Sequence, residues 1–301
     1  MELKYLQEIA KTLNFSLKQI DSIAQLHSEG STIPFIARYR KEATGNLDEV
    51  QIADVIDKIK YFTELEKRKE TVIKTIEGLG KLTPELKQRI ENSIDATELE
   101  DIYLPFKPKR KTKASVAIEK GLEPLAKFLF EQKDVNVETE ATKYIAEQVK
   151  DAPDALQGAR DIIAEWVAEN EQARNSIRKL FQETALFSSR VLTSKKEEPD
   201  AQKYRDYFEF NEPLAQSPSH RILAIRRGEK EGFLIMEITV EKETAVGILQ
   251  NLFVKSSNAA SQQVKLAVED SFGRLLKFSI ETEFRMLSKT KADEEAIRVF
   301  A

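Results

Sequence analysis

The spacing of apolar residues predicts helices over most of the first two thirds of the chain. Between Leu3 and Leu13, apolar residues recur at intervals of three and four, which places them on one face of a helix. Ser16, followed three residues later by Gln19, has the capping-box pattern of a helix start, and a second apolar stripe continues to Gly30. A mainly α-helical, multi-helical fold is therefore expected.

The longest predicted helix begins near Asn46, which can serve as its N-cap. Asp48 and Glu49 favour the positive end of a helix, and Gly78 and Gly80 are expected to stop it. About thirty residues at roughly 1.5 Å each give a length of roughly 45 Å, which exceeds the width of a small domain. We expect this helix to act as a strut between separate packing units.

Further along, a helix is expected over 97–103 and another over 115–132, followed by a short acidic linker at 134–138. Two apolar helical faces then flank Asn170. Two short helices around a tight turn are typical of a helix-turn-helix arrangement, so a helix-turn-helix-like unit is predicted over about 155–186.

The last third begins with a different pattern. Residues 232–240 form a short run of branched apolar residues bounded by turn residues, which predicts a small β element. The flanking segments 221–231 and 241–253 are compatible with either strand or helix. A helix is expected over 258–277, and another after a cap at Ser279.

The charged segment 195–202, which contains Pro199, is the preferred domain boundary. It divides a helical region, 1–198, from a mixed but mostly helical region, 199–301. A chain of 301 residues is long enough for two domains.

Composition narrows the setting of this protein. The chain has no cysteine, which excludes disulfides and thiolate metal sites and favours a reducing compartment. It has no run approaching the roughly 18 apolar residues of a membrane span and no signal-peptide pattern at its start. A cytoplasmic protein without membrane association is expected.

Catalytic motifs are absent from the sequence. It contains no glycine-rich phosphate-binding loop and no nucleophile elbow. His27 and His220 are far apart and have no metal-ligand spacing. We therefore expect neither an enzyme nor a metal or other cofactor.

A basic segment, KPKRKTK, interrupts the helical pattern at 107–113. Six cations against one anion, Glu119, lie between Tyr103 and Gly121, in a chain whose net charge is −4. Lysines and arginines on an extended backbone could neutralise phosphates without reading bases, or the loop could be solvated and pair with acidic helices of the same protein. The cations of this candidate site are Lys107, Lys109, Arg110, Lys111 and Lys113.

The second helix of the helix-turn-helix-like unit carries three more candidate cations, Arg174, Arg178 and Lys179. Arg174 and Arg178 are four residues apart, so they point in the same direction, as a helix that enters a DNA groove requires. Exposed charge on an amphipathic helix is the more common explanation, and it favours a scaffold or protein-contact role.

The segment 31–51 reads STIPFIARYRKEATGNLDEVQ. We expect Phe35 and Ile36 to be buried, with Arg38, Arg40 and Lys41 directly beside them. These cations could form a phosphate clamp or an internal scaffold. The scaffold is favoured because arginine at a domain seam is often paired with a carboxylate; candidate partners are Glu42, Asp48 and Glu49.

This segment, together with EDIYLPFKPKRKTKASVAIEKGLEPLA at 100–126 and SIETEFRMLSKTKADEEAIRVFA at 279–301, resembles the Tex family of bacterial transcription accessory proteins. The three stretches occur in the family's order and span nearly the whole chain. The resemblance implies that the natural protein continues beyond residue 301 into an RNase H-like domain, a helix-hairpin-helix region and an RNA-binding OB-fold domain.

By this resemblance, the chain is expected to be the non-catalytic helical scaffold of a transcription accessory protein. RNA would bind mainly to the domains beyond residue 301, and RNA or DNA would bind weakly here, through the basic loop. The alternative is a protein-interaction scaffold that docks on RNA polymerase or the ribosome and has no nucleic-acid affinity of its own. The oligomeric state stays open.

Overall fold

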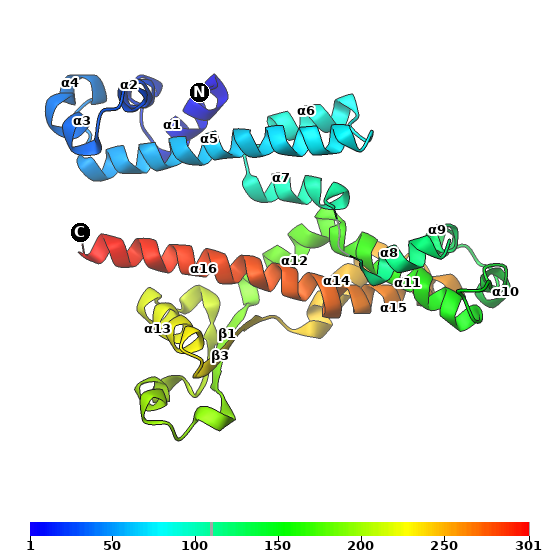
Figure 1. Cartoon of the computed structure of the whole chain (residues 1–301). Coiled ribbons are helices and arrows are strands. Elements are labelled where there is room, and N and C mark those ends of the chain that lie inside the picture. Colours follow the sequence, from blue (N-terminus) through cyan, green and yellow to red (C-terminus); the bar gives the residue numbers. More distant parts are fainter. Residues whose placement is uncertain (109–110, 301) are drawn as a thin grey trace. The chain divides into compact units, whose positions relative to one another are not determined.

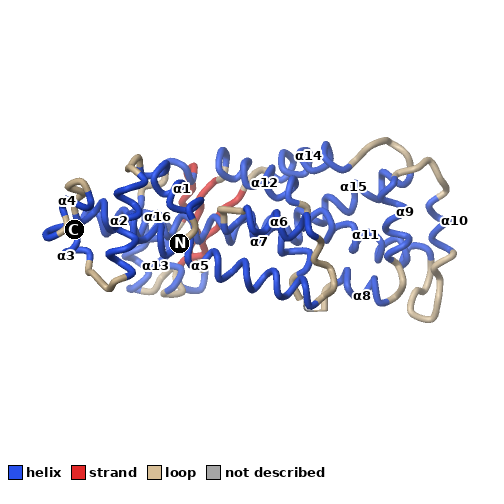
Figure 2. The backbone as a smooth tube through the Cα atoms, turned by 90° about the horizontal axis from the view of Figure 1, so that it is seen from above, coloured by secondary structure: helices blue, strands red, loops and turns tan. Residues whose placement is uncertain are grey.

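The computed structural model describes residues 1–108 and 111–300. The protein is mainly α-helical with one small antiparallel sheet, which confirms the expected fold class (Figures 1 and 2). It divides into two compact units, Met1–Pro108 (unit 1) and Lys109–Ala301 (unit 2).

This division differs from the boundary predicted near Pro199. That position lies inside unit 2, because the strand before it pairs with both strands after it.

Unit 1 is a set of helices arranged along one long helix. Its elements are α1 (Leu3–Leu13), α2 (Leu17–Ser28), α3 (Ile33–Tyr39), α4 (Lys41–Thr44), α5 (Glu49–Gly78), α6 (Pro84–Asn92), α7 (Ala96–Tyr103) and the 3₁₀ helix η1 (Leu104–Phe106). The capping box of Ser16 and Gln19 is present at the start of α2, as predicted.

The long helix α5 is confirmed, but its cap is Asp48 rather than Asn46. The Asp48 side chain accepts a hydrogen bond from the Gln51 backbone N–H, and the Gln51 side chain accepts one from the Asp48 N–H. Asn46 instead adopts a left-handed backbone conformation in the preceding turn. Helices α1 to α3 pack on α5, and so do α6 and α7. Both groups of helices belong to unit 1. Helix α5 is therefore the central helix of this one unit, and not the strut between separate packing units that was expected.

Unit 2 contains the remaining elements. These are α8 (Lys113–Glu119), α9 (Glu123–Glu131), α10 (Val137–Thr142), α11 (Ala152–Glu169), α12 (Glu171–Thr184), β1 (Leu186–Val191), η2 (Thr193–Lys195), η3 (Pro199–Tyr207), β2 (Glu209–Pro213), η4 (Leu214–Gln216), α13 (Ser219–Lys230), β3 (Leu234–Thr239), α14 (Lys242–Phe253), α15 (Ala259–Ser271), the π-helical turn η5 (Phe272–Leu276) and α16 (Lys277–Phe300).

Two predicted helix boundaries in unit 2 are wrong. The single helix expected over 115–132 is two helices, α8 and α9, because Gly121 has a positive φ of 78° that ends the first one. Ser279 is not a cap, since α15, η5 and α16 follow one another without a break. The two ambiguous segments are the helices α13 and α14.

The sheet has the strand order β2-β1-β3, with both pairs antiparallel. Strand β3 confirms the β element predicted at 232–240. Strands β1 and β2 were not predicted, because each is short and mixes apolar with polar residues. Phe187 on β1 lies opposite Ile238 on β3, and both are buried.

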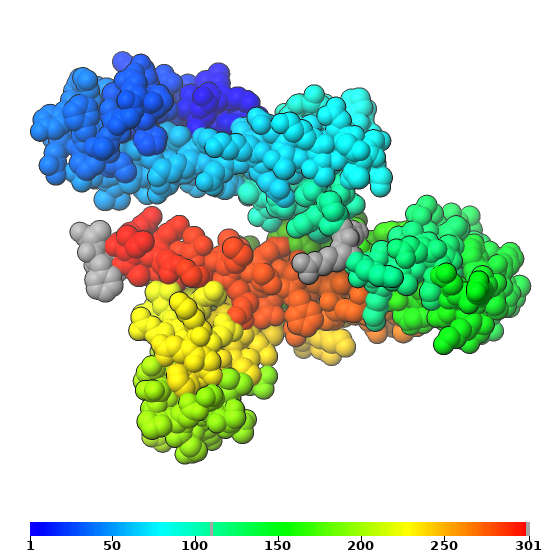
Figure 3. Space-filling view, viewed as in Figure 1, coloured from blue at the N-terminus to red at the C-terminus, as the bar shows by residue number. Residues whose placement is uncertain are grey.

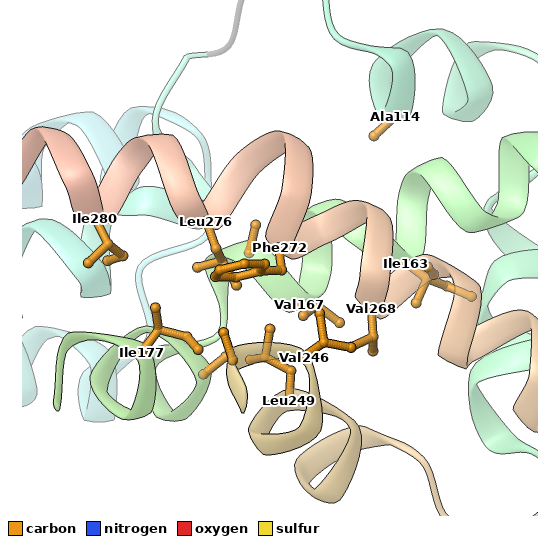
Figure 4. Packing of buried hydrophobic residues seen from close by; sticks show 14 of the residues in the cluster. Ala114, Ile163, Val167, Ile177, Val246, Leu249, Val268, Phe272, Leu276 and Ile280 are labelled. Carbon is orange, nitrogen blue, oxygen red and sulfur yellow. The ribbon is translucent and has the colours of Figure 1, made fainter. Parts of the chain in front are cut away.

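The core of unit 2 is built around α11 and the continuous path from α15 to α16. Figure 4 shows Phe272 and Leu276 directed toward Val246 and Leu249 of α14 and Ile177 of α12, and all five are buried. Helices α8, α9 and α15 also pack on α11. One face of α12, which includes Ile177, is buried in this core.

Candidate nucleic-acid interface

The segment after Ser31 forms the short helix α3, in which some side chains point into the core of unit 1 and others point to solvent. Ile36 is fully buried, as predicted, and Ala37 beside it is also buried. Phe35 was predicted to be buried as well, and this is wrong, because 40% of Phe35 is exposed. Successive residues of a helix point about 100° apart, so a helix that turns Ile36 and Ala37 inward leaves Phe35 and Tyr39 together on its outer side.

Phe35 and Tyr39 form an exposed aromatic pair. Their ring centroids are 5.3 Å apart, and Tyr39 is 68% exposed. The Arg40 guanidinium lies 5.8 Å from the Phe35 ring centroid, a cation–π distance. Figure 3 shows the N-terminal helices of unit 1, α3 and α4 among them, in blue.

The three cations beside the aromatic pair are all exposed. Arg38 forms the carboxylate contact that was predicted, with its Nε 3.4 Å from Glu49 Oε1, but both side chains are largely in solvent. Within the described parts of the chain, neither Arg40 nor Lys41 makes a salt bridge. The surface formed by Phe35, Arg38, Tyr39, Arg40 and Lys41 is called the α3–α4 surface below.

A close contact with α2 fixes this surface. Gln19 donates a hydrogen bond from its side-chain amide to the Thr44 carbonyl over 2.9 Å, and Thr44 is fully buried. At Gly45, φ is +66°, and an added Cβ would lie 2.7 Å from the Gln19 amide nitrogen. The left-handed backbone conformation therefore favours glycine at this position, and a larger residue would displace the Gln19 amide.

The basic segment 107–113 crosses the division between the two units. Lys107 is exposed at the end of unit 1, and Lys111 and Lys113 are exposed in unit 2, where α8 begins at Lys113. Lys109 and Arg110 lie outside the described residues. Where it is described, the segment before Lys113 is non-helical, as expected.

A cavity of about 490 Å³ in unit 2 includes Lys111, Lys113 and Lys120 in its lining, together with Asp154 and Asp161. Lys120 Nζ is 3.9 Å from Asp154 Oδ2. Burial raises the pKa of the Asp161 carboxyl, although Lys113 and Arg274 lie nearby and act in the opposite direction. The two carboxylates oppose anion binding at this cavity, so it is less suited to a phosphate than the basic sequence alone indicates.

The cations of α12 do not have the geometry expected of a groove-entering helix. Arg174 is buried, with 5% of its surface exposed; its guanidinium donates to Ser279 Oγ over 3.2 Å and forms an ion pair with Glu283. Arg178 Nε lies 2.6 Å from the other Glu283 oxygen. These two arginines attach α12 to α16.

Lys179 is exposed and lies 3.9 Å from Glu183. A single residue, Asn170, separates α11 from α12, which is shorter than the three- or four-residue turn typical of the DNA-binding motif. On this helix, the alternative of a scaffold role agrees better with the geometry.

Residues 1–108 and 111–300 contain no group of three or more His, Asp or Glu side chains placed to hold a metal ion. Within the same residues, no helix is long and apolar enough to cross a membrane.

Comparison with known proteins identifies the family. Residues 3–77 match the Tex-like protein N-terminal domain, and residues 132–300 match the family described as Tex central region-like. The chain belongs to the Tex family. The resemblance inferred from three sequence stretches is thereby confirmed.

Several Tex relatives align with nearly the whole chain. The chain is 39% identical over 300 residues to the uncharacterized protein YdcI of Bacillus subtilis, an alignment that covers 98% of this chain and 41% of the relative. It is 38% identical over 302 residues to the transcriptional accessory protein Tex of Neisseria gonorrhoeae, covering 97% and 39%.

A human relative, S1 RNA-binding domain-containing protein 1, is 30% identical over 294 residues, covering 93% of this chain and 29% of that protein. The chain thus spans about two fifths of the length of the bacterial relatives.

The α3–α4 surface lies within the part of the chain that matches the Tex N-terminal domain. Its exposed aromatic pair was missed from the sequence. The signal that could have revealed it is the four-residue spacing of Phe35 and Tyr39, which places them on one face of a helix, together with Ile36 and Ala37 on another.

Proposed function

We propose that this chain is a non-catalytic helical scaffold of a Tex-type transcription accessory protein, and that its α3–α4 surface contacts single-stranded nucleic acid. The exposure of Phe35 and Tyr39 beside three cations carries this proposal. An aromatic face stacks on any base, and neighbouring cations neutralise the backbone phosphates. Such a surface binds without reading sequence.

Single strands are favoured over duplexes on physical grounds. The bases of a duplex are stacked on one another, so their faces are closed to a protein side chain, whereas the bases of a single strand are open. Stacking contributes roughly 1–3 kcal/mol per base. The basic segment 107–113 would add a second, purely electrostatic contact, weakened by the carboxylates near Lys111 and Lys113.

The rival function is docking on RNA polymerase or the ribosome without nucleic-acid binding. The acidic net charge of −4 favours it, because a dedicated nucleic-acid module is usually basic. Salt dependence separates the two functions, since phosphate binding weakens steeply with salt and apolar docking does not.

The test is a fluorescence-anisotropy titration of the whole chain with a labelled 15-nucleotide single-stranded RNA and with a duplex DNA, each at two salt concentrations. The parent chain should prefer the single strand. The double variant Phe35→Ala/Tyr39→Ala should weaken binding at least tenfold, and Arg40→Ala/Lys41→Ala should reduce the salt slope by about 1.4, the value for two phosphates on a single strand.

Phe278→Ala is the matched control. Phe278 is 57% exposed and has the Lys277 ammonium 5.8 Å from its ring centroid, so it resembles the Phe35–Arg40 pair but stands in unit 2. Its removal should leave binding unchanged. Equal losses in both aromatic variants, or no salt-dependent binding by the parent, would refute the proposal.

A further inference from the structure

A second feature of unit 1 is a groove of about 830 Å³ bordered by α1, α2 and α5. Its volume falls in the range of roughly 300–1,000 Å³ that is typical of ligand pockets. The apolar residues of its lining include Tyr5, Leu6, Ala24, Ile59 and Phe62.

Contacts among buried residues hold the groove in shape. The rings of Tyr5 and Phe62 stack with centroids 4.6 Å apart. Lys69 is only 2% exposed, and its ammonium donates to Tyr5 Oη over 2.7 Å, Glu66 Oε1 over 2.9 Å and the Glu91 carbonyl over 3.0 Å. All three donors of the lysine are therefore used, and the groove needs little ordering to receive a partner.

The charge of the groove is opposite to that of the α3–α4 surface. Its lining includes the carboxylates of Glu2, Asp21, Glu66 and Glu70, and Lys67 is the one lysine or arginine among the described lining residues.

Two of these carboxylates already have partners. Lys4 Nζ lies 2.8 Å from Glu2, and Glu66 accepts hydrogen bonds from the Tyr5 hydroxyl and the Lys69 ammonium. Asp21 and Glu70 are exposed, and in the described part of the chain neither forms a salt bridge. The groove would repel a phosphate and attract a cation.

We propose that this groove binds a basic amphipathic helix of a partner protein. An amphipathic helix places apolar anchors from one face into such a groove, and lysines or arginines at its edges would meet Asp21 and Glu70. Nucleic acid is excluded as the occupant by the charge of the groove. This inference is independent of the function proposed for the α3–α4 surface, because it rests on a different set of residues.

The test uses two fluorescein-labelled 18-residue peptides made of the same leucines and lysines. In one peptide the leucines have helical spacing, and in the other the order is scrambled, so that charge and composition are equal and only the apolar face differs. The parent chain should bind the periodic peptide at least tenfold more tightly in an anisotropy titration.

The variant Asp21→Lys/Glu70→Lys should weaken that binding at least fivefold. The matched control Glu64→Lys/Glu77→Lys makes the same change in net charge at two exposed positions of α5 outside the groove lining, and it should bind like the parent. Thr63→Trp, which adds bulk at an exposed lining residue, should also weaken binding. Unchanged melting temperatures would show that all three variants are folded.

Three results would overturn the proposal. Equal binding of the two peptides would mean that only charge is recognised. Equal losses in the two charge-reversal variants would assign the effect to the overall field of the protein. Self-association of the parent chain that is lost in Asp21→Lys/Glu70→Lys would make a second copy of this chain the occupant.

Discussion

The α3–α4 surface and helix α12 each carry two or more arginines or lysines within a few residues of one another. The surroundings of these cations differ between the two regions. On α12, Arg174 is buried and shares Glu283 with Arg178. On α3–α4, Arg40 and Lys41 are exposed and, in the described residues, have no carboxylate partner within salt-bridge distance.

The spacing of cations in the sequence therefore does not distinguish a binding surface from a set of cations that joins two helices of the same protein. The residue that decides the role of the α12 arginines is Glu283 of α16, more than a hundred positions further along the chain. A buried charge must be paired, whereas an exposed one is stabilised by water.

The largest expected effect is on stability, at Glu283. Glu283→Ala would remove the carboxylate that the buried Arg174 shares with Arg178, and we expect a loss of roughly 3–5 kcal/mol in the free energy of unfolding. Urea denaturation followed by circular dichroism measures it. Glu49→Ala removes the exposed partner of Arg38 and should cost less than about 1 kcal/mol. Similar losses in the two variants would contradict the distinction between the buried arginine pair of α12 and the exposed Arg38–Glu49 pair.

The next prediction compares two neighbours on α3. Ile36→Ala removes a fully buried side chain and should cost roughly 2–5 kcal/mol, while Phe35→Ala should change stability by about 0.5 kcal/mol or less, as for an ordinary surface position. The same denaturation experiment measures both. A large loss from Phe35→Ala would return this residue to the core and remove the aromatic pair from the proposed site.

A smaller effect is expected at the basic segment. Lys109→Ala/Arg110→Ala/Lys111→Ala removes three cations from a segment without apolar residues, so binding of single-stranded RNA should weaken and its salt slope should fall by up to about 2. The melting temperature should hardly change. A large drop in melting temperature would instead identify these cations as internal partners.

The smallest effect is expected at Lys179, the exposed cation of α12. Because its ion pair with Glu183, at 3.9 Å, is exposed, Lys179→Ala should alter stability by less than about 0.5 kcal/mol and leave RNA binding unchanged. An appreciable loss of binding in the anisotropy titration would restore α12 as a nucleic-acid contact.

Local signals predicted much of the fold. The helical spacing and glycine stops located α5, the capping box at Ser16 fixed the start of α2, and the branched apolar run located β3. Errors arose where two local signals competed. Asp48 and Gln51 form the capping box at the start of α5, so Asp48 rather than Asn46 is the N-cap. Asn46 is one of the left-handed residues of the preceding turn.

The candidate site was only partly predictable. The cations of 31–51 were recognised from the sequence, but apolar character alone suggested that both Phe35 and Ile36 were buried. Helix α3 buries Ile36 and Ala37 on its packed side and leaves Phe35 on its outer side. The pairing of Arg174 with Glu283 depends on how α16 returns to α12, and no local pattern contains that information.

Contact between the α3–α4 surface and single-stranded RNA is tested most directly by photocrosslinking of the whole chain to an RNA that contains 5-iodouracil, with the modified residues mapped by mass spectrometry. We expect crosslinks at Phe35 or Tyr39 that disappear when unlabelled RNA is added in excess. Crosslinks confined to other residues, with Phe35 and Tyr39 unmodified, would contradict this contact.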